Sequence, residues 1–221
     1  MALDNTLDTN LHQEEKTMVT RTLDNKDNKW PEDYGDSNNG KDVIHAKGGK
    51  DVIHGGNNTD KLYGENGEDY LDGGAGNDDL YGGNNKDTLY GKANNDKLYG
   101  ETGNDYLDGG AGDDDLYGGA GDDDLYGGAG KDDLYGGAGD DKFYFGKKEG
   151  GDTIHNFQNA DYIELDGNYT NDPGDSTPDD GKYYIKQNSP GNYVVKWNNH
   201  DQVDEYYEIY VKGDNPLGDI A

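Results

Sequence analysis

Residues 109–126 read GGAGDDDLYGGAGDDDLY, which is one nine-residue unit written twice without a change. The same unit, with substitutions, repeats twelve times in unbroken register from residue 37 to residue 144. A fixed period of this kind is typical of repeat proteins, in which each copy packs against its neighbours and a continuous core forms by stacking. The period therefore predicts a stacked architecture for about half of the chain.

Two positions of the unit keep their chemical character in every copy. The eighth is always a large apolar residue, from Ile44 in the first copy to Phe143 in the last. Positions one to four are mostly Gly or Asn, which enter positive φ at the least cost. We therefore expect a tight polar turn to alternate with a three-residue strand centred on the apolar residue. The sixth position is always Asp: Asp42, Asp51, Asp60, Asp69, Asp78, Asp87, Asp96, Asp105, Asp114, Asp123, Asp132 and Asp141.

The composition is unusual for a protein that folds on its core alone. Only 29% of the residues are hydrophobic, 37 are Gly, and the formal net charge is -29. Such values are typical of a disordered, self-repelling polymer. Twelve buried apolar side chains cannot offset the entropy lost when the repeats become ordered. We therefore expect an external ligand that is positively charged and binds oxygen, and calcium fits because it takes about six to eight oxygen ligands.

The spacing of the unit also favours a cation site. A turn that points several carbonyl groups at one centre needs residues without a bulky Cβ, and Gly meets this need. One carboxylate per loop gives two per ion, which neutralises calcium without leaving surplus buried charge. The alternative, a flexible linker rich in Gly and Asp, does not explain an apolar residue at a strict period of nine.

This unit resembles the calcium-binding nonapeptide of the RTX family, Gly-Gly-x-Gly-x-Asp-x-apolar-x, found in secreted bacterial toxins, proteases, lipases, epimerases and adhesins. The resemblance implies an all-β fold: a right-handed parallel β-roll, a calcium-bound solenoid, with a C-terminal β-rich capping segment. Two successive copies make one turn, so that each loop stacks on the loop two copies later. Several Ca²⁺ ions are expected between stacked loops.

The resemblance also implies a ligand set. Each ion takes the carbonyls of positions two and four plus the Asp of one loop, and the carbonyls of positions one and three plus the Asp of the loop 18 residues later. One site would use Gly110, Gly112 and Asp114 with Gly127, Ala129 and Asp132. A neighbouring site on the opposite edge would use Gly119, Gly121 and Asp123 with Gly136, Ala138 and Asp141. The remaining expected metal residues are Asp152, Gly73, Gly74, Ala75, Gly76, Gly82, Gly83, Gly91, Gly100, Gly109, Ala111, Gly118, Ala120, Gly128, Gly130, Gly137 and Gly139.

Some copies depart from the pattern. Asn replaces the fourth-position Gly three times, which is tolerable because Asn enters the left-handed region more readily than most residues. A charged residue at the second position keeps its carbonyl, but a Lys near a cation weakens binding. We therefore expect fraying at Ser37 and the tightest sites between residues 100 and 141. The substitutions are Asn58, Asn85 and Asn94 at position four, and Lys47, Glu65, Lys92 and Glu101 at position two.

Aromatic residues occupy the ninth position of most copies. On a roll, the odd copies share one face and should stack about 4.8 Å apart, the spacing of neighbouring strands, with His45 continuing the column. The column comprises Tyr63, Tyr81, Tyr99, Tyr117 and Tyr135. The other face should carry Tyr90, Tyr126 and Tyr144, broken by Asp72 and Asp108. Two interpretations stay open: the rings stabilise and shield the sheet, or they form a platform for a sugar or a protein partner.

The flanking segments carry weaker signals. Residues 1–36 are polar and are expected to be a disordered or loose lead-in, with Trp30 and Tyr34 folding back onto the first turn. The roll is expected over residues 37–157, and residues 158–221 should form a β-rich cap from Tyr183–Lys186, Tyr193–Trp197 and Tyr206–Lys212, anchored by Phe157 and Trp197. The start resembles no Sec signal peptide, and no run reaches the length of a membrane span.

Function follows from the resemblance and from what the motifs lack. No His-Glu-x-x-His, Gly-x-Ser-x-Gly or Cys is present, so we expect no catalytic residue and no enzyme activity. The negative charge makes nucleic acid an improbable partner. Zero Cys suits an extracellular protein that folds on calcium. RTX proteins typically leave through a type I secretion apparatus, and Gly218-Asp219-Ile220-Ala221 is similar to their C-terminal signals.

The expected function is therefore a calcium-binding RTX module of a secreted bacterial protein. It would stay unfolded at low intracellular calcium, fold on calcium outside the cell, and support type I secretion and stability. The alternative is a calcium-dependent carbohydrate-binding or adhesive module that uses the Tyr face.

Overall fold

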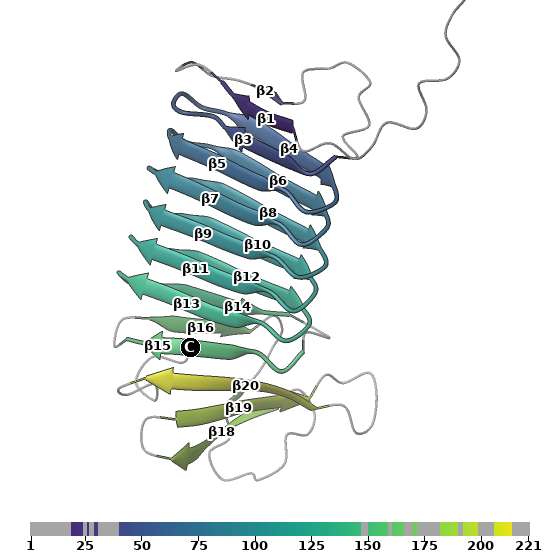
Figure 1. Ribbon diagram of the computed structural model, residues 1–221. Coiled ribbons are helices and arrows are strands. Elements are labelled where there is room, and N and C mark those ends of the chain that lie inside the picture. Colours follow the sequence, from purple (N-terminus) through teal and green to yellow (C-terminus); the bar gives the residue numbers. More distant parts are fainter. Residues whose placement is uncertain are drawn as a thin grey trace, which may run out of the picture.

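The computed structural model describes residues 19–23, 26, 29–30, 40–146, 150–158 and 161–165, and the strands at 170–171, 182–189, 192–198 and 206–213. All regular structure among these residues is β, and the strands form two sheets that face each other in a stack (Figure 1). No helix in this part of the chain could cross a membrane. The parallel β-roll implied by the family resemblance is confirmed.

The strands alternate between the two sheets along the repeats. The first sheet contains, in spatial order, β1 (Val19–Thr22), β3 (Asp42–His45), β5 (Lys61–Asn66), β7 (Asp79–Asn84), β9 (Lys97–Thr102), β11 (Asp115–Ala120), β13 (Asp133–Ala138), β15 (Thr153–Phe157), β20 (Tyr206–Gly213), β19 (Asn192–Asn198), β18 (Lys182–Ser189) and β17 (Thr170–Asn171). The second contains β16 (Tyr162–Leu165), β14 (Lys142–Phe145), β12 (Asp124–Ala129), β10 (Tyr106–Ala111), β8 (Thr88–Ala93), β6 (Tyr70–Ala75), β4 (Val52–Asn57) and β2 (Lys29–Trp30).

Pairing within the repeats is parallel and keeps one register. Leu116 pairs with Leu98 on one side and Leu134 on the other, and Leu107 pairs with Leu125 in the second sheet. Every partner is 18 residues away, so two copies make one turn. Each loop therefore stacks on the loop two copies later, as the family resemblance implied.

The full strands are longer than predicted. Most strands of the repeats span six residues, because pairing continues from the apolar triplet into the loop of the next copy, where Gly119 pairs with Gly137 and Ala120 with Ala138. The expectation of a three-residue strand was wrong for this reason. The first three loop positions are thus held by the sheet ladder, which sets the direction of their carbonyl groups.

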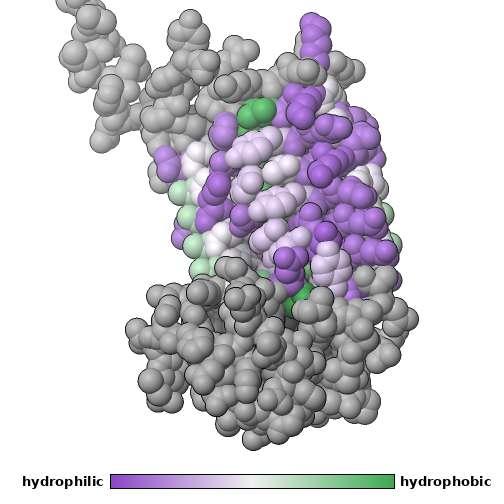
Figure 2. All heavy atoms as spheres, turned by 180° about the vertical axis from the view of Figure 1, so that it is seen from behind, coloured by the Kyte–Doolittle hydropathy of each residue, from purple (hydrophilic) through white to green (hydrophobic). Residues whose placement is uncertain are grey.

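The core is a single column of apolar side chains between the two sheets. Eighth-position residues from Ile44 to Phe143 are 0% exposed, because successive residues of a strand point to opposite faces. The outside remains polar: the face seen in Figure 2 is mostly hydrophilic and carries a strip of less hydrophilic side chains. The buried column comprises Ile44, Ala46, Ile53, Leu62, Leu71, Leu80, Leu89, Leu98, Leu107, Leu116, Leu125, Leu134, Phe143, Phe145, Ile154, Phe157 and Ile163.

Both ends of the roll extend beyond the predicted boundaries. Strands β1 and β2 pair in parallel with β3 and β4, so these parts of residues 1–36 are ordered and the lead-in prediction is wrong for them. Trp30 pairs with Ile53 through the backbone, whereas Tyr34 and Ser37 lie outside the described residues. At the other end, β16 pairs with β14 and carries the roll to Leu165 instead of residue 157.

The C-terminal segment closes the first sheet. Strand β20 pairs in parallel with β15, and β19 and β18 follow in antiparallel pairs, at the end of the stack shown in yellow and olive (Figure 1). All three predicted β-rich runs lie within these strands. Phe157 is 2% exposed, and its ring centroid lies 5.9 Å from that of Phe143. The side chain of Trp197, the other predicted anchor, lies outside the described residues.

Candidate metal centre

The sixth-position Asp residues form two hydrogen-bonded ladders, one along each edge of the roll. From the second member of each ladder onward, the Oδ1 atom of each Asp accepts the backbone N–H of the Asp one turn earlier, as Asp132 does from Asp114 at 2.9 Å and Asp141 from Asp123 at 3.0 Å. These side chains are at most 3% exposed. One ladder comprises Asp42, Asp60, Asp78, Asp96, Asp114, Asp132 and Asp152, and the other Asp51, Asp69, Asp87, Asp105, Asp123, Asp141 and Asp161.

The second carboxylate oxygen, Oδ2, is buried without a hydrogen-bond donor in most of the ladder. A buried carboxylate oxygen with no donor is costly unless a cation compensates it. The orphaned Oδ2 atoms therefore indicate where positive charge is needed. Within the described residues they belong to Asp42, Asp60, Asp69, Asp78, Asp87, Asp96, Asp105, Asp114, Asp123, Asp132 and Asp141.

Burial acts on the protonation of these carboxyls. Desolvation raises the pKa of Asp87 and Asp96 to about 8, and that of Asp114, Asp123 and Asp141 to about 7, while the backbone hydrogen bond opposes it. Neighbouring Asp charges raise these pKa values further. Each unit of pKa corresponds to about 1.4 kcal/mol. Ionising several of them without a cation therefore costs free energy on the scale of the total stability of an ordinary domain, about 5–15 kcal/mol.

Backbone carbonyls of one loop point at the loop stacked on it. A Cβ added to Gly128 would lie 2.2 Å from the carbonyl oxygen of Gly110, and one added to Gly130 would lie 1.7 Å from that of Gly112. The second- and fourth-position carbonyls of one loop thus point at the loop that follows one turn later. The first-position carbonyl of Gly127 points back, 2.6 Å from where a Cβ of Gly109 would be.

The carboxylate oxygen completes this cradle. In the same loop, Asp114 Oδ2 lies 2.5 Å from the Cβ position of Gly109, beside the carbonyl of Gly127. First-position glycines are needed here because any side chain would displace the oxygens. The opposite edge repeats the arrangement: Asp123 Oδ2 and Gly136 O lie 2.4 and 2.6 Å from the Cβ position of Gly118. On each edge, therefore, one Asp oxygen and one first-position carbonyl of the expected ligand set lie beside the same glycine, and the full ligand sets stay predictions.

Third-position carbonyls take part in loop stacking as well. Ala129 O accepts the N–H of Gly112 at 2.8 Å, and Ala138 O accepts that of Gly121 at 2.8 Å. A carbonyl oxygen has two lone pairs, so one remains for an ion. These bonds hold adjacent loops together without a metal.

The donor set fits calcium. Carboxylate and carbonyl oxygens are the ligands that calcium prefers, whereas zinc sites are built from His and Cys. Within the described residues, no three His, Cys, Asp or Glu side chains gather in one metal cluster. Sites at the stacked loops would therefore combine two Asp carboxylates with backbone carbonyls, and bound calcium would supply the positive charge that their buried oxygens lack.

The loops differ from one another in the residues that occupy their left-handed backbone positions. The fourth-position Asn58, Asn85 and Asn94 adopt φ between 77° and 80°, as predicted. The second position is left-handed as well, including in copies that do not carry Gly there. Four residues with a Cβ are strained there at φ between 69° and 82°: Lys47, Glu65, Lys92 and Glu101. Ala46 stands at the first position, where ten later copies have Gly, so the cradle of the loop at residues 46–51 differs.

Asp161 is a ladder member that the sequence analysis missed. It is 1% exposed, and its Oδ1 accepts the N–H of Asp141 at 3.1 Å. It lies nine residues after Asp152 and is followed at the expected distance by Ile163, so the signal was present. The interruption after Phe145 concealed it, because partners beyond that point are 20 residues apart instead of 18.

The Tyr column on the first sheet is confirmed. Neighbouring ring centroids from Tyr63 to Tyr135 are 4.6–4.9 Å apart, with planes within 10° of parallel. His45 and His155 stack on its two ends at 4.4 and 4.3 Å. Each of these rings thus covers the faces of its neighbours.

The aromatic column on the second sheet is not broken, contrary to the prediction. Tyr70 and Tyr106 stand at the seventh position, two residues before Asp72 and Asp108 on the same strands, and continue the column there. The centroids of Tyr70, Tyr90, Tyr106 and Tyr126 follow one another at 5.0–5.6 Å, with planes tilted by 38–50°. The prediction considered only ninth positions, whereas the seventh and ninth residues of a strand share its outer face.

Comparison with known families agrees with this geometry. The model of the RTX calcium-binding nonapeptide repeat matches residues 36–71, 54–89, 63–98, 81–116, 90–125 and 117–147. These matches together span residues 36–147, just over half of the 221 residues. No match was found among curated proteins. The chain, with its buried Asp ladders and carbonyl cradles, belongs to the family of RTX calcium-binding nonapeptide repeat proteins.

Proposed function

We propose that this chain is a calcium-responsive folding module of a secreted protein, and that it supports type I secretion and the stability of the exported product. The observation that carries the proposal is the pair of Asp ladders with buried, donor-free Oδ2 atoms. These oxygens face a carbonyl cradle at both edges of the roll. The proposal assigns ion binding and folding to these residues, and no catalysis.

Charge explains how calcium and folding are coupled. The chain carries a net charge of -29, and folding stacks Asp carboxylates in a buried row. Without a cation, repulsion and desolvation oppose that stacking. One calcium ion between two loops neutralises two carboxylates and meets their oxygens, so its binding free energy becomes folding free energy. A cell interior poor in calcium would then hold the chain unfolded, and millimolar calcium outside would fold it.

Calcium titration tests this coupling. We expect far-UV circular dichroism to gain β signal as calcium is added, and the radius of gyration to fall from roughly 50 Å towards roughly 20 Å. Magnesium is the control, because it demands near-ideal octahedral geometry and releases its waters reluctantly. A chelated sample as compact and cooperative as the loaded one would contradict the proposal.

Export is tested separately. The chain is expressed with and without a type I secretion apparatus, and we expect it in the medium only when the apparatus is present. Retention of the chain inside cells that contain a working apparatus would contradict the secretion part and leave the calcium-coupled folding intact.

A second candidate function, carbohydrate binding or adhesion, is favoured by one observation. Sugar rings pack against aromatic faces, and the stacked rings of the Tyr63–Tyr135 column cover one another. The tilted rings of Tyr70, Tyr90 and Tyr106 on the second sheet do not cover their faces fully. Lys92 Nζ lies 4.1 Å from the centroid of the Tyr90 ring, so this column already accepts a contact on a face. The second face is therefore the better platform.

A glycan array in calcium tests this candidate. Retention that disappears in a Tyr90→Ala, Tyr106→Ala double variant and survives in a Tyr99→Ala, Tyr117→Ala double variant would support it. No retention by the wild-type chain would leave both aromatic columns with a structural role alone.

A further inference from the structure

The last loop on one edge of the roll differs from the loops before it. The loop at residues 136–141 faces the segment that ends at Asp161, which replaces the usual Gly-rich turn. Within that segment Gln158 makes two contacts with groups that belong to the ligand pattern. These contacts involve one carbonyl and one carboxylate oxygen.

The carbonyl is that of Gly137. It stands at the second position of the twelfth copy, and the side-chain Nε2 of Gln158 donates a hydrogen bond to it. The equivalent carbonyls one and two turns earlier, those of Gly119 and Glu101, point at the next loop in the same way, 2.1 and 2.2 Å from the Cβ positions of Gly137 and Gly119. An amide N–H thus takes the place beside Gly137 O where the resemblance implies a cation.

The carboxylate oxygen is Asp161 Oδ2. It accepts the backbone N–H of Gln158 at 2.7 Å, while Oδ1 accepts that of Asp141 in the ladder. In the two preceding members of this ladder, Asp123 and Asp141, the Oδ2 atom is buried without a donor. Gln158 therefore provides N–H groups to both kinds of oxygen that a cation would otherwise compensate.

We infer that Gln158 ends the column of ions on this edge: its side-chain and backbone N–H groups replace a calcium ion between the loop at residues 136–141 and Asp161. The last ion on this edge then lies between the loops that end at Asp123 and Asp141. An amide supplies only partial positive charge, which suffices for Asp161 Oδ2 and Gly137 O. The donor-free Asp141 Oδ2 is in the expected ligand set of the preceding ion, which it shares with Asp123. The terminal turn of the roll is consequently held without calcium. This inference rests on the proposed calcium binding of the other loops.

Counting bound ions tests the inference, by equilibrium dialysis with calcium and by native mass spectrometry. In Asp161→Asn, we expect the same number of calcium ions as in the wild-type chain. The matched control is Asp141→Asn, which alters the preceding ladder member and should lose at least one ion.

The converse variant should create a site. Gln158→Glu replaces the donor beside Gly137 O with a carboxylate, so a cation becomes necessary there, and we expect one additional calcium ion per chain. Its control is Asn77→Asp, which adds the same charge at an exposed fifth position and should add no ion. Loss of an ion in Asp161→Asn, or no gain in Gln158→Glu, would overturn this inference alone. A wild-type chain that binds no calcium would overturn the proposed function together with it.

Discussion

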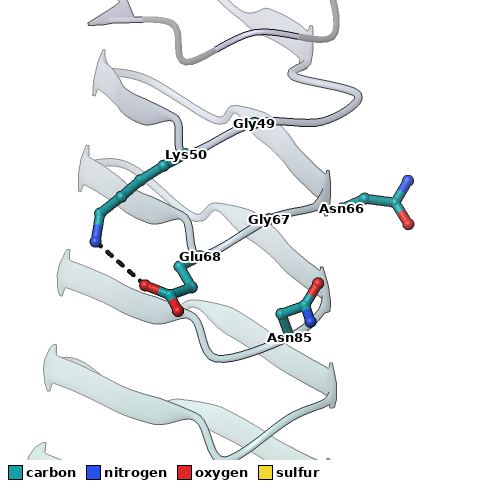
Figure 3. Close-up of a pocket in the computed structure, with 6 residues that line it drawn as sticks. All are labelled: Gly49, Lys50, Asn66, Gly67, Glu68 and Asn85. Atoms are coloured by element: carbon teal, nitrogen blue, oxygen red, sulfur yellow. Dashed lines mark hydrogen bonds and ion pairs between the residues drawn. The ribbon is translucent and has the colours of Figure 1, made fainter.

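The loops within residues 46–87 and those within residues 100–141 share one fold but hold their neighbours in different ways. In the first group, the fifth-position side chains Lys50 and Glu68 form an exposed ion pair at 3.4 Å across two loops (Figure 3). In the second group, Asp122 Oδ1 accepts the N–H of Asp140 at 3.0 Å, and Asn104 Oδ1 accepts that of Asp122 at 3.1 Å. Surface ion pairs contribute little, whereas a short side chain bound to the backbone orients the loop itself.

The difference continues at the cation cradle. The first group carries Ala46 at a first position, Lys47 and Glu65 at strained second positions, and Lys50 nearby. The second group has Gly at all of its second and fourth positions except Glu101. In the second group, hydrogen bonds hold stacked loops together without an ion, and glycines leave the carbonyl groups unobstructed. Both features lower the conformational entropy that calcium binding must offset. We therefore expect the positions around the invariant Asp to set the calcium affinity of each loop.

Calcium withdrawal is expected to produce the largest difference between the two groups of loops. As calcium is lowered, we expect the loops within residues 46–87 to open before those within residues 100–141, because we expect their sites to bind calcium more weakly. Hydrogen exchange followed by mass spectrometry at graded calcium reports each group separately. Loss of protection at one calcium level for both groups would show that the roll responds as a unit and that the loop differences do not matter.

Acidity should act on both groups alike. Burial raises the pKa of Asp60 to about 7 in the first group and that of Asp123 to about 7 in the second, from an ordinary value near 3.8. Protonated Asp is favoured in the folded state, so this contribution to stability is present below pH 4 and is lost as pH rises through about 7.

The calcium-free chain should therefore be more compact at pH 5 than at pH 8, and calcium should bind more weakly at pH 5 because protons compete for the carboxylates. Circular dichroism and small-angle scattering check the first point, and calorimetry the second. High salt is the control, because it screens exposed charges but not buried ones. A metal-free chain that is more ordered at pH 8 would contradict the prediction.

Equivalent Asp substitutions in the two groups of loops measure how much each ladder contributes to stability. Asp123→Asn and Asp69→Asn each remove a charge and one acceptor oxygen from the Asp ladder. We expect the first to lower the free energy of unfolding in calcium by about 2–3 kcal/mol, the scale of a bond to a charged group, and the second to cost about half as much because its site is weaker. Chemical denaturation in saturating calcium measures both, with the exposed Asp140→Asn as control. Equal losses would contradict the proposed gradient.

Two substitutions at the fifth position compare the two kinds of contact between stacked loops. Asp122→Ala leaves the Asp140 N–H without its acceptor and should cost about 1 kcal/mol. Lys50→Ala removes the exposed pair with Glu68 and should cost less than about 0.5 kcal/mol. Denaturation curves of both variants in calcium decide the matter. A larger loss in Lys50→Ala would mean that the ion pair of Figure 3 is the stronger clamp.

The smallest expected effect is a gain in stability. Glu101 is the one second-position residue within residues 100–141 that has a Cβ, and its φ is 71°. Glu101→Gly should relieve left-handed strain and raise the free energy of unfolding by about 1 kcal/mol. Thermal denaturation in calcium tests it, with Glu68→Gly as a control at a position without positive φ. A loss of stability would show that the Glu side chain contributes a contact larger than the strain.

Much of the fold could be predicted because the repeat is periodic. The invariant Asp and apolar positions indicated which side chains are buried, and the 18-residue stacking followed from the family resemblance. Asp161 was missed because two extra residues break the period before it. The continuous second aromatic column was missed because Tyr70 and Tyr106 belong to another position of the unit, and only the paired strands show that they share its face.

By itself the sequence determined the turn–strand alternation, the buried apolar column and the membership of a calcium-binding repeat family, because each depends on residue types that recur at a fixed period. Only the tertiary structure decided where the ladders end, which second-position residues are strained, and that Gln158 meets Gly137 and Asp161. These features depend on contacts about 20 residues apart, and two inserted residues are enough to change which groups meet.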